Sequence, residues 1–313
     1  MDMSVIIDPI VKLFIAILIG FVSVKAGYLS ADMRNVLSKI IIKVTLPLMI
    51  ITSLLSKDLS GDTAMNAAVA AVSAVVVMTV LYFLGLGTAN LFRLKEPTKT
   101  LHAVLSGSGN VGFLGYPVAL AVFGTEGLFY AVIYGMVNDA VFWTAGVYLI
   151  NRSGGSLVGR QALKKLVNPN TVAFLIGIPL LFFGVKLPPV LNDAFTGIGS
   201  CTTYMSMLFI GMTLVTIDIK SLYKRVSMIA PALIKMVIVP VLVSMLFVHF
   251  GLNPVTIGAV VLEIAMPAQT VASIVAMEAG SDEKYAAEYI FFSTLLSLLT
   301  LPLIYYIMER IMA

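Results

Sequence analysis

Three charged side chains lie inside long apolar runs of the sequence: Asp139, Lys235 and Glu263. A charge in the middle of a membrane span costs at least about 2.5–3.5 kcal/mol on insertion scales, so such residues are usually paired or functional. A carboxylate beside free backbone carbonyls can bind Na⁺ or carry a proton, and we therefore expect Glu263 and Asp139 to couple an ion. Lys235 is expected either to approach a substrate carboxylate or to neutralise an acid. The alternative for each is a hydrogen bond or ion pair between helices.

Two apolar segments also contain residues that interrupt helices. The first is "SGSGNVG" (106–112) and the second is "AMPAQT" (265–270). We expect each segment to break a membrane helix, at Gly107–Asn110 and at Met266–Gln269, because glycine and proline weaken or remove helical hydrogen bonds. Within a bilayer the freed backbone groups must face protein or a watery cavity.

Such breaks predict a site for an anion. The N-terminal ends of half-helices carry unpaired N–H donors and partial positive charge, which suit a carboxylate. The expected substrate-binding residues are Gly109, Asn110, Val111, Pro267, Gln269 and Thr270. Gln269 is also expected at the ion site, and Asn138, Lys235 and Pro117 are expected to support it, with Pro117 kinking the second half-helix. The alternative is close helix packing at small residues, with ordinary proline kinks.

The composition places these segments in a membrane. The 313 residues are 59% hydrophobic and 12% charged, with a mean hydropathy of +1.02, whereas a soluble domain carries about twice that charged fraction. An apolar run of about 20 residues can cross a bilayer as a helix. We therefore predict an all-α membrane protein with ten transmembrane helices, at residues 5–25, 35–56, 64–92, 100–124, 127–150, 168–185, 190–216, 223–249, 254–279 and 285–309.

Lysine and arginine are distributed unevenly between the predicted loops. Fourteen of the 20 lie on one side of the membrane and three on the other. Because cytoplasmic loops are enriched in these residues, we expect a multi-pass protein of the cytoplasmic membrane with both termini outside. This bias accounts for the basic loops, so that no nucleic-acid partner is expected.

The two halves of the chain are similar in pattern. "DPIVKLFIAILIGFVSVKAGYL" (8–29) opens the first half and "NPNTVAFLIGIPLLFFGVKLPPVL" (168–191) opens the second, each with an Asp-Pro or Asn-Pro pair that suits the start of a helix. Five spans in each half require the halves to be inverted in the membrane, as in many secondary transporters. We predict a first repeat at 1–151, a cytoplasmic loop at 152–166 and a second repeat at 167–313.

Other classes of function lack their sequence signals. The chain has no P-loop of the Gly-x-x-x-x-Gly-Lys-Ser/Thr type, no Ser/His/Asp set and no zinc-binding set, and Cys201 is its sole cysteine. We therefore expect no enzymatic activity, and no cofactor apart from Na⁺ or H⁺ as a coupling ion.

Several stretches of the chain resemble the auxin efflux carrier family, in particular its short bacterial members described as malonate or malate permeases. The matching stretches are "VTLPLMIITSLL" (44–55), "SGNVGFLGYPVALAVFG" (108–124), "LVNPNTVAFLIGI" (166–178), "AMPAQTVASIVAMEAG" (265–280) and "FFSTLLSLLTLPLIYY" (291–306). The resemblance implies ten helices in a 5+5 inverted repeat with crossed, broken helices 4 and 9, the fold of bile-acid sodium symporters and sodium/proton antiporters. It also implies elevator-type alternating access between a scaffold (helices 1, 2, 6 and 7) and a transport domain (helices 3–5 and 8–10), and a homodimer formed through the scaffold.

Two local features qualify this resemblance. Plant carriers have Pro-Asn at the first crossover, whereas here Gly109 precedes Asn110. The stretch "LEIAMPAQ" (262–269) is similar to the Glu-x-x-Met-Gln segment that binds sodium in bile-acid symporters, with two residues inserted before the glutamine. This similarity implies Na⁺ at Glu263.

Together these features predict a secondary active transporter that moves a small organic anion, such as a malonate-, malate- or auxin-like carboxylate, across the lipid bilayer. One alternative is a sodium/proton antiporter, which would need acids as the central groups of its site. Another is a sodium-coupled symporter of a different organic solute. Outside transport, the alternative is a membrane receptor or sensor.

Overall fold

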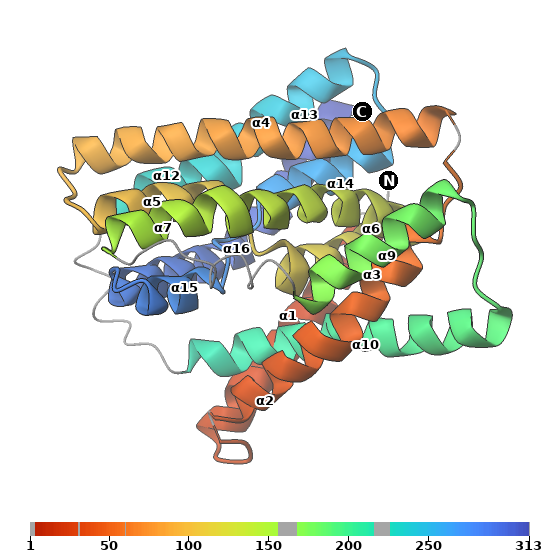
Figure 1. Ribbon diagram of the computed structural model, residues 1–313, viewed down its shortest axis with the longest axis horizontal. Coiled ribbons are helices and arrows are strands. Elements are labelled where there is room, and N and C mark those ends of the chain that lie inside the picture. The colour runs from red at the N-terminus through yellow and green to blue at the C-terminus, as the bar shows by residue number, and fades with distance from the viewer. Residues whose placement is uncertain (1–3, 31, 60, 156–167, 216–225, 313) are drawn as a thin grey trace. The chain divides into compact units, whose positions relative to one another are not determined.

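The computed structural model describes residues 4–30, 32–59, 61–155, 168–215 and 226–312 (Figure 1). In this part of the chain the regular structure is helical, and β-pairing is limited to an isolated antiparallel bridge between Gly109 and Ala268. Of the predicted cytoplasmic loop, residues 156–166 lie outside the described residues. So do six basic residues on which the predicted orientation partly rests: Arg160, Lys164, Lys165, Lys220, Lys224 and Arg225.

The helices of the first half follow the predicted runs. They are α1 (Ser4–Lys25), α2 (Met33–Ile40), α3 (Leu46–Leu54), α4 (Gly61–Leu91), α5 (Thr98–Gly107), α6 (Tyr116–Val141) and α7 (Val147–Ser153), with π-helical turns at Ile41–Thr45, Val111–Gly115 and Phe142–Gly146. Gly124 interrupts α6, because its φ of 65° and ψ of −159° are not helical. α6 therefore contains the end of one predicted span and the start of the next.

The second half is built in the same way from apolar helices. They are α9 (Pro169–Phe182), α10 (Pro189–Leu214), α12 (Ile229–Leu233), α13 (Val239–His249), α14 (Pro254–Ile264), α15 (Ala272–Glu278) and α16 (Glu283–Met312), with a 3-10 turn at Val226–Met228 and a π-helical turn at Ile234–Ile238. The predicted run 254–279 therefore contains two helices, α14 and α15, separated by seven residues without regular helix.

Among the described residues, five helical segments are long and apolar enough to cross a bilayer. They are Met33–Leu54, Gly61–Leu91, Val111–Ser153, Val226–His249 and Glu283–Met312. α9 and α14 are apolar but shorter. The structure thus confirms an all-helical multi-pass membrane protein, whereas the division into ten separate spans stays a prediction.

Asparagine-proline pairs begin two of the helices. Asn168 Oδ1 accepts two backbone N–H groups from the first turn of α9, each at 3.0 Å, and Asn253 caps α14 in the same manner. Side-chain acceptors of this kind satisfy N–H groups that have no partner within the helix. The predicted start at Asp8-Pro9 is wrong: α1 begins at Ser4, because the apolar run continues ahead of Pro9.

The contacts divide the chain into two compact units. Unit 1 comprises Met1–Ala70, Gly112–Ile133 and Val167–Ile217, and unit 2 comprises Ala71–Val111, Tyr134–Leu166 and Asp218–Ala313. Unit 1 holds α1–α3, α9 and α10, which are the helices expected in a scaffold. It differs from that expectation by also including residues 61–70 and 112–133. Residues 112–133 pack there through a Phe113–Phe209 ring contact, with centroids 5.0 Å apart, and an ion pair of 3.2 Å between Lys57 and Glu126.

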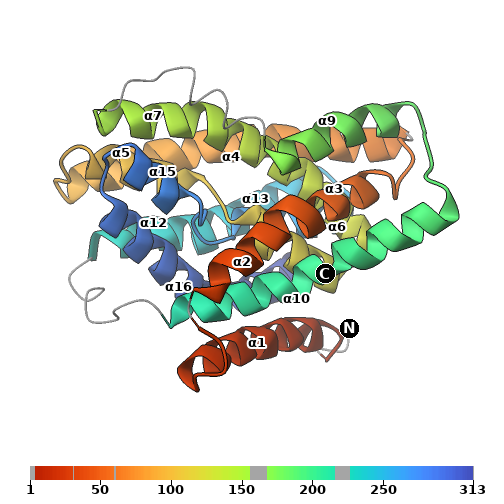
Figure 2. The same ribbon diagram turned by 60° about the horizontal axis from the view of Figure 1, so that its bottom comes forward.

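In unit 1, α1 and α10 lie side by side with their backbones in close contact (Figure 2). Two glycines make this approach possible. A Cβ atom at Gly20 would lie 2.4 Å from the carbonyl oxygen of Leu208, and one at Gly211 would lie 2.0 Å from that of Ile17. Small residues permit such contacts between membrane helices, and any larger side chain would collide with backbone that cannot move aside.

Replacing Gly211 with valine is therefore expected to destabilise unit 1. Overpacking of a close contact costs about 1–3 kcal/mol, so the midpoint of thermal unfolding in detergent should fall by roughly 2–10 °C. Gly197→Ala is the matched control on the same helix, because a Cβ there meets nothing within 4 Å. It should leave the midpoint unchanged or raise it slightly, since alanine is the better helix former. Equal midpoints for the two variants would contradict the close packing of α1 and α10.

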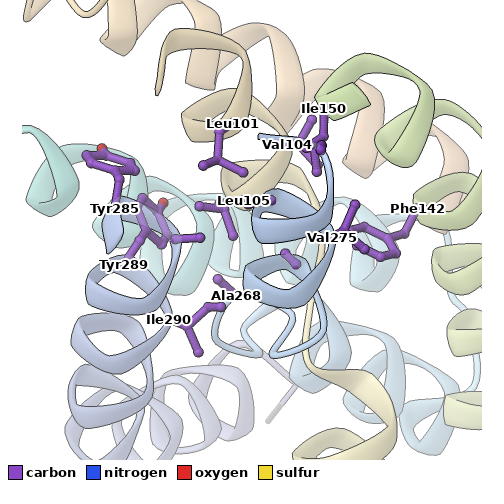
Figure 3. Close-up of a cluster of buried hydrophobic side chains, with 14 of the residues drawn as sticks. Leu101, Val104, Leu105, Phe142, Ile150, Ala268, Val275, Tyr285, Tyr289 and Ile290 are labelled. Carbon is purple, nitrogen blue, oxygen red and sulfur yellow. The ribbon is translucent and has the colours of Figure 1, made fainter. Parts of the chain in front are cut away.

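The core of unit 2 gathers apolar side chains from α5, α7, α15 and α16 (Figure 3). Leu101 and Leu105 of α5, Tyr289 and Ile290 of α16, and Ala268 belong to one buried cluster. Because Ala268 comes from the segment between α14 and α15, this core fixes that segment beside the end of α5.

Candidate functional site

Two helices are interrupted where the sequence predicts, and both interruptions lie in unit 2. α5 ends at Gly107, and Ser108 that follows is extended, with φ −94° and ψ 138°. Helical structure resumes at Val111 with a π-helical turn. α14 ends at Ile264 and α15 begins at Ala272, so that the segment between them includes the predicted break at Met266–Gln269. Each interruption frees backbone N–H and C=O groups inside an apolar region.

The freed backbone groups of the two segments partly satisfy one another. The N–H of Asn110 donates to the carbonyl oxygen of Pro267 at 2.8 Å, and Gly109 forms the antiparallel bridge with Ala268. The N–H of Ala268 donates in turn to Ser293 Oγ of α16 at 3.1 Å. Because an unsatisfied backbone group in hydrocarbon costs several kcal/mol, these bonds are what permits two breaks at one place.

Asn138 of α6 holds the first break in position. Its side-chain amide accepts a hydrogen bond from the N–H of Gly109 at 3.1 Å and donates one to the carbonyl oxygen of the same residue at 3.3 Å. Asn138 is 1% exposed. The amide of Asn138 thus bonds both backbone polar groups of Gly109.

Lys235 supports the same break from another helix. It lies in the π-helical turn Ile234–Ile238, is 2% exposed, and its Nζ donates to the carbonyl oxygen of Ser108. A cation is favourable at this position because the C-terminal end of α5 carries partial negative charge. Among the described residues no ion pair joins Lys235 to a carboxylate, so the expected neutralisation of an acid by direct pairing is not found.

The polar side chains of the two breaks also meet. Asn110 Nδ2 donates to Thr270 Oγ1 at 3.0 Å, and Gln269 Nε2 donates to Asp139 Oδ1 at 3.2 Å. Asn110 and Gln269 are 4% and 7% exposed, and Gln269 Oε1 has no hydrogen-bond partner within the described residues. The cluster therefore combines amide donors, a hydroxyl and backbone groups at one place, which is the set that can hold a small polar solute.

Glu263 lies in the last turn of α14, next to this cluster. It is 1% exposed, and neither of its carboxylate oxygens has a hydrogen-bond partner among the described residues. Asp139 and Tyr134 lie close enough to interact with it electrostatically. A buried carboxylate without donors is costly unless it is neutralised by a proton or a cation. No group of three or more His, Cys, Asp or Glu side chains able to hold a metal occurs in the described part of the chain.

The structure brings most of the predicted site residues together within unit 2. They are Gly109, Asn110, Val111, Asn138, Asp139, Lys235, Glu263, Pro267, Gln269 and Thr270. Pro117 differs: it belongs to unit 1 and follows the π-helical turn Val111–Gly115 in the first turn of α6. Helical structure is continuous from Val111 past Pro117, with the π-helical turn directly ahead of the proline, and the predicted kink at Pro117 stays a prediction.

Sequence reasoning missed two contributors to the site. Ser293 accepts the N–H of Ala268, and the carbonyl of Ser108 accepts from Lys235. A serine within an apolar helix is common and carries no signal of its own. A backbone carbonyl has no sequence signal at all, so both partners become visible only once the helices are packed.

The chain matches the family model described as "Membrane transport protein" twice, over residues 5–162 and 156–305. An "Uncharacterized transporter" of Methanothermobacter thermautotrophicus is 27% identical over 304 residues, which cover 95% of this chain and 96% of that protein. "Uncharacterized transporter MJ1031" of Methanocaldococcus jannaschii is 26% identical with the same coverage. A "Putative malonate transporter" of Rhizobium meliloti is 24% identical over 242 residues, 75% of this chain and 74% of that protein. The chain is therefore a multi-pass membrane transporter, not an enzyme, and belongs to the membrane transport protein family, which is the auxin efflux carrier family that its sequence resembles.

Proposed function

We propose that the chain is a secondary active transporter of small organic anions, with a malonate- or malate-like carboxylate bound at the paired breaks of unit 2. The observation that carries the proposal is the antiparallel pairing of two interrupted helices around Asn110, Gln269 and Thr270. Broken helices inside a membrane are retained where they form a solute site. The malonate assignment is supported by the name of the Rhizobium meliloti relative.

The substrate carboxylate in this proposal is held by the amide of Asn110, by Gln269 and Thr270, and by the backbone N–H group of Val111. The N–H groups of Gly109, Asn110 and Ala268 already donate within the site. Hydrogen bonds to a charged partner are stronger than those between neutral groups, at about 1.5–3 kcal/mol each. Asn138 and Lys235 keep the breaks open through Gly109 and Ser108. They act as positioning residues and have no contact with the solute.

Alternating access of the elevator type is the proposed mechanism, with unit 2 carrying the site and unit 1 acting as the scaffold of a homodimer. Two inverted repeats at 1–151 and 167–313, joined by the loop 152–166, would give ten spans with both termini outside the cytoplasmic membrane. The double match of the family model supports the repeat, because each matched region contains one interrupted helix. The division of α1–α3, α9 and α10 from the site-bearing residues supports the mechanical roles of the two units.

Glu263 is the proposed coupling group, assisted by Asp139 and Gln269. Its two unpartnered carboxylate oxygens can take up H⁺ or bind Na⁺ together with backbone oxygens at the end of α14. The same observation favours the second candidate function, a sodium/proton antiporter, in which the carboxylates carry the transported ion and no organic solute is bound. A sodium-coupled symporter of another organic solute would use the same groups.

Uptake into proteoliposomes separates these candidates. The purified chain should accumulate labelled malonate or malate when a Na⁺ gradient or a pH gradient is imposed. One of these two gradients should raise the initial rate of uptake at least about 10-fold over the rate without it, because tight coupling makes net flux depend on the ion. Empty liposomes provide the baseline. Cation exchange without flux of any organic anion would establish the antiporter instead. Carboxylate uptake that is independent of Na⁺ would exclude Na⁺ at Glu263.

A further inference from the structure

Unit 1 contains a cavity of about 550 Å³ that is separate from the breaks of unit 2. Its walls come from α3 and the residues that follow it, from the first part of α6, and from α10 with the residues that precede it. Clefts of this volume are typical for small-molecule ligands. Nothing in the proposed function uses this cavity.

Hydroxyl groups dominate the polar part of the lining. Three of them donate to backbone carbonyls of their own helix or turn: Thr52 to Leu48 at 2.9 Å, Ser56 to Ser53 at 2.7 Å, and Ser200 to Gly197 at 2.7 Å. A hydroxyl whose proton is used in this way keeps oxygen lone pairs that can accept a hydrogen bond. The cavity therefore presents acceptors to a ligand that carries an O–H donor.

Ser53 is a buried polar group in the cavity wall whose hydroxyl a bound ligand could satisfy. It is 3% exposed, it lines the cavity, and its Oγ has no hydrogen-bond partner among the described residues. A buried hydroxyl without a partner costs about 1–3 kcal/mol. A polar solute in the cavity would remove that cost.

A track of polar residues leads from the cavity along one face of α10. Asn192, Thr196 and Ser200 line the cavity, and Thr203 and Ser206 continue the same i+3/i+4 spacing towards the interior. Thr203 and Ser206 are 8% and 0% exposed, and their hydroxyls have no partner in the described part of the chain. Unpartnered hydroxyls along a membrane helix are suited to a path for water and polar solutes.

The charges of the cavity restrict the ligand further. Lys186 and Asp193 both line it, and Lys186 Nζ is paired with Asp58 Oδ1 at 2.6 Å. Lys186 and the amide of Asn192 can donate to one carboxylate of a ligand. A second negative charge would be repelled by Asp193, whereas an O–H group could donate to its carboxylate.

We propose that this cavity is a binding site for a small carboxylate that carries a single negative charge and an O–H donor, as in a hydroxy acid or a half-protonated dicarboxylate. The proposal rests on the proposed function in that the ligand is the transported substrate or its singly charged form. It adds a second site and a charge state of the ligand, both decided by residues of unit 1.

Protection of a cysteine from alkylation tests the site without requiring transport. The variant Ser200→Cys with Cys201→Ser places the only thiol in the cavity wall, and the native chain, whose exposed Cys201 does not line the cavity, is the matched control. Alkylation by N-ethylmaleimide is followed with L-lactate, propionate or malonate present at neutral pH, where malonate carries two charges. Lactate should slow alkylation of the thiol at position 200 at least about 3-fold and leave the alkylation rate of Cys201 in the native chain unchanged. It should protect position 200 at a lower concentration than propionate or malonate does.

Ser53→Ala in the cysteine variant provides a second measurement. Loss of one hydrogen bond should raise the lactate concentration needed for half-protection roughly five-fold. Equal effects of all three acids, or none, overturn the cavity site even if the same vesicles take up carboxylate. Absence of carboxylate uptake by the wild type would overturn the proposed function instead, and the protection measured at position 200 would still decide the cavity.

Discussion

Replacing Asn110 with alanine should lower the initial rate of carboxylate uptake roughly 10- to 100-fold. The substitution removes an amide that bonds Thr270 across the two breaks and that donates to the substrate in our proposal. Each lost hydrogen bond to a charged group is worth about 1.5–3 kcal/mol, which sets this range. The measurement is labelled malonate uptake into proteoliposomes, with protein content matched between variants. Gln269→Ala should cause a fall of similar size, since it removes the other side-chain amide and leaves Asp139 with the longer hydrogen bond from Asn138.

The matched control is Asn151→Ala. Asn151 also belongs to unit 2, but its amide donates to the carbonyl oxygen of Val147 in its own helix, at 2.7 Å. Its removal should change uptake by less than about two-fold. Thermal unfolding of all variants in detergent separates a damaged site from a damaged fold. Wild-type uptake by folded Asn110→Ala and Gln269→Ala proteins would show that the substrate site is misplaced.

Replacing Glu263 with glutamine should abolish the dependence of uptake on the driving gradient. The amide is close in shape to a protonated carboxylic acid but can neither release a proton nor attract Na⁺ by charge. Gradient-driven accumulation should therefore fall at least about 10-fold, while the midpoint of thermal unfolding stays equal or rises. It should not fall, because the substitution removes a buried carboxylate that has no hydrogen-bond partner among the described residues.

Glu283→Gln is the control for this prediction. Glu283 begins α16 in the same unit and is exposed, so its charge is already hydrated and its loss should leave accumulation and gradient dependence unchanged. Gradient-driven accumulation by the Asp139→Asn protein should lie between the values for Glu263→Gln and Glu283→Gln. Unlike Glu263, Asp139 accepts a hydrogen bond from Gln269, so its charge is already partly stabilised. An unchanged response of the Glu263→Gln protein to Na⁺ and pH gradients would exclude this residue from coupling.

Local properties of the sequence were sufficient for the class of the protein and the position of the breaks. Hydropathy predicts membrane helices because the bilayer acts on each segment separately, and the helices lie in the predicted runs. Glycine, proline and asparagine likewise act on their own backbone, so Gly107–Asn110 and Met266–Gln269 could be identified as breaks. The same reasoning failed at Asp8-Pro9, where α1 begins ahead of the proline.

Only the tertiary structure decided which polar atoms meet. Asn110 forms hydrogen bonds with Pro267 and Thr270, which lie more than 150 positions further along the chain. Asn138 accepts a hydrogen bond from the N–H of Gly109, and Lys235 donates to a backbone carbonyl rather than to an acid. The same packing leaves Glu263 without a hydrogen-bond partner among the described residues. Sequence determined the apolar helices and their interruptions, because these depend on residues close along the chain. The pairing of the interruptions and the isolation of one carboxylate depend on how distant helices pack, which no local pattern specifies.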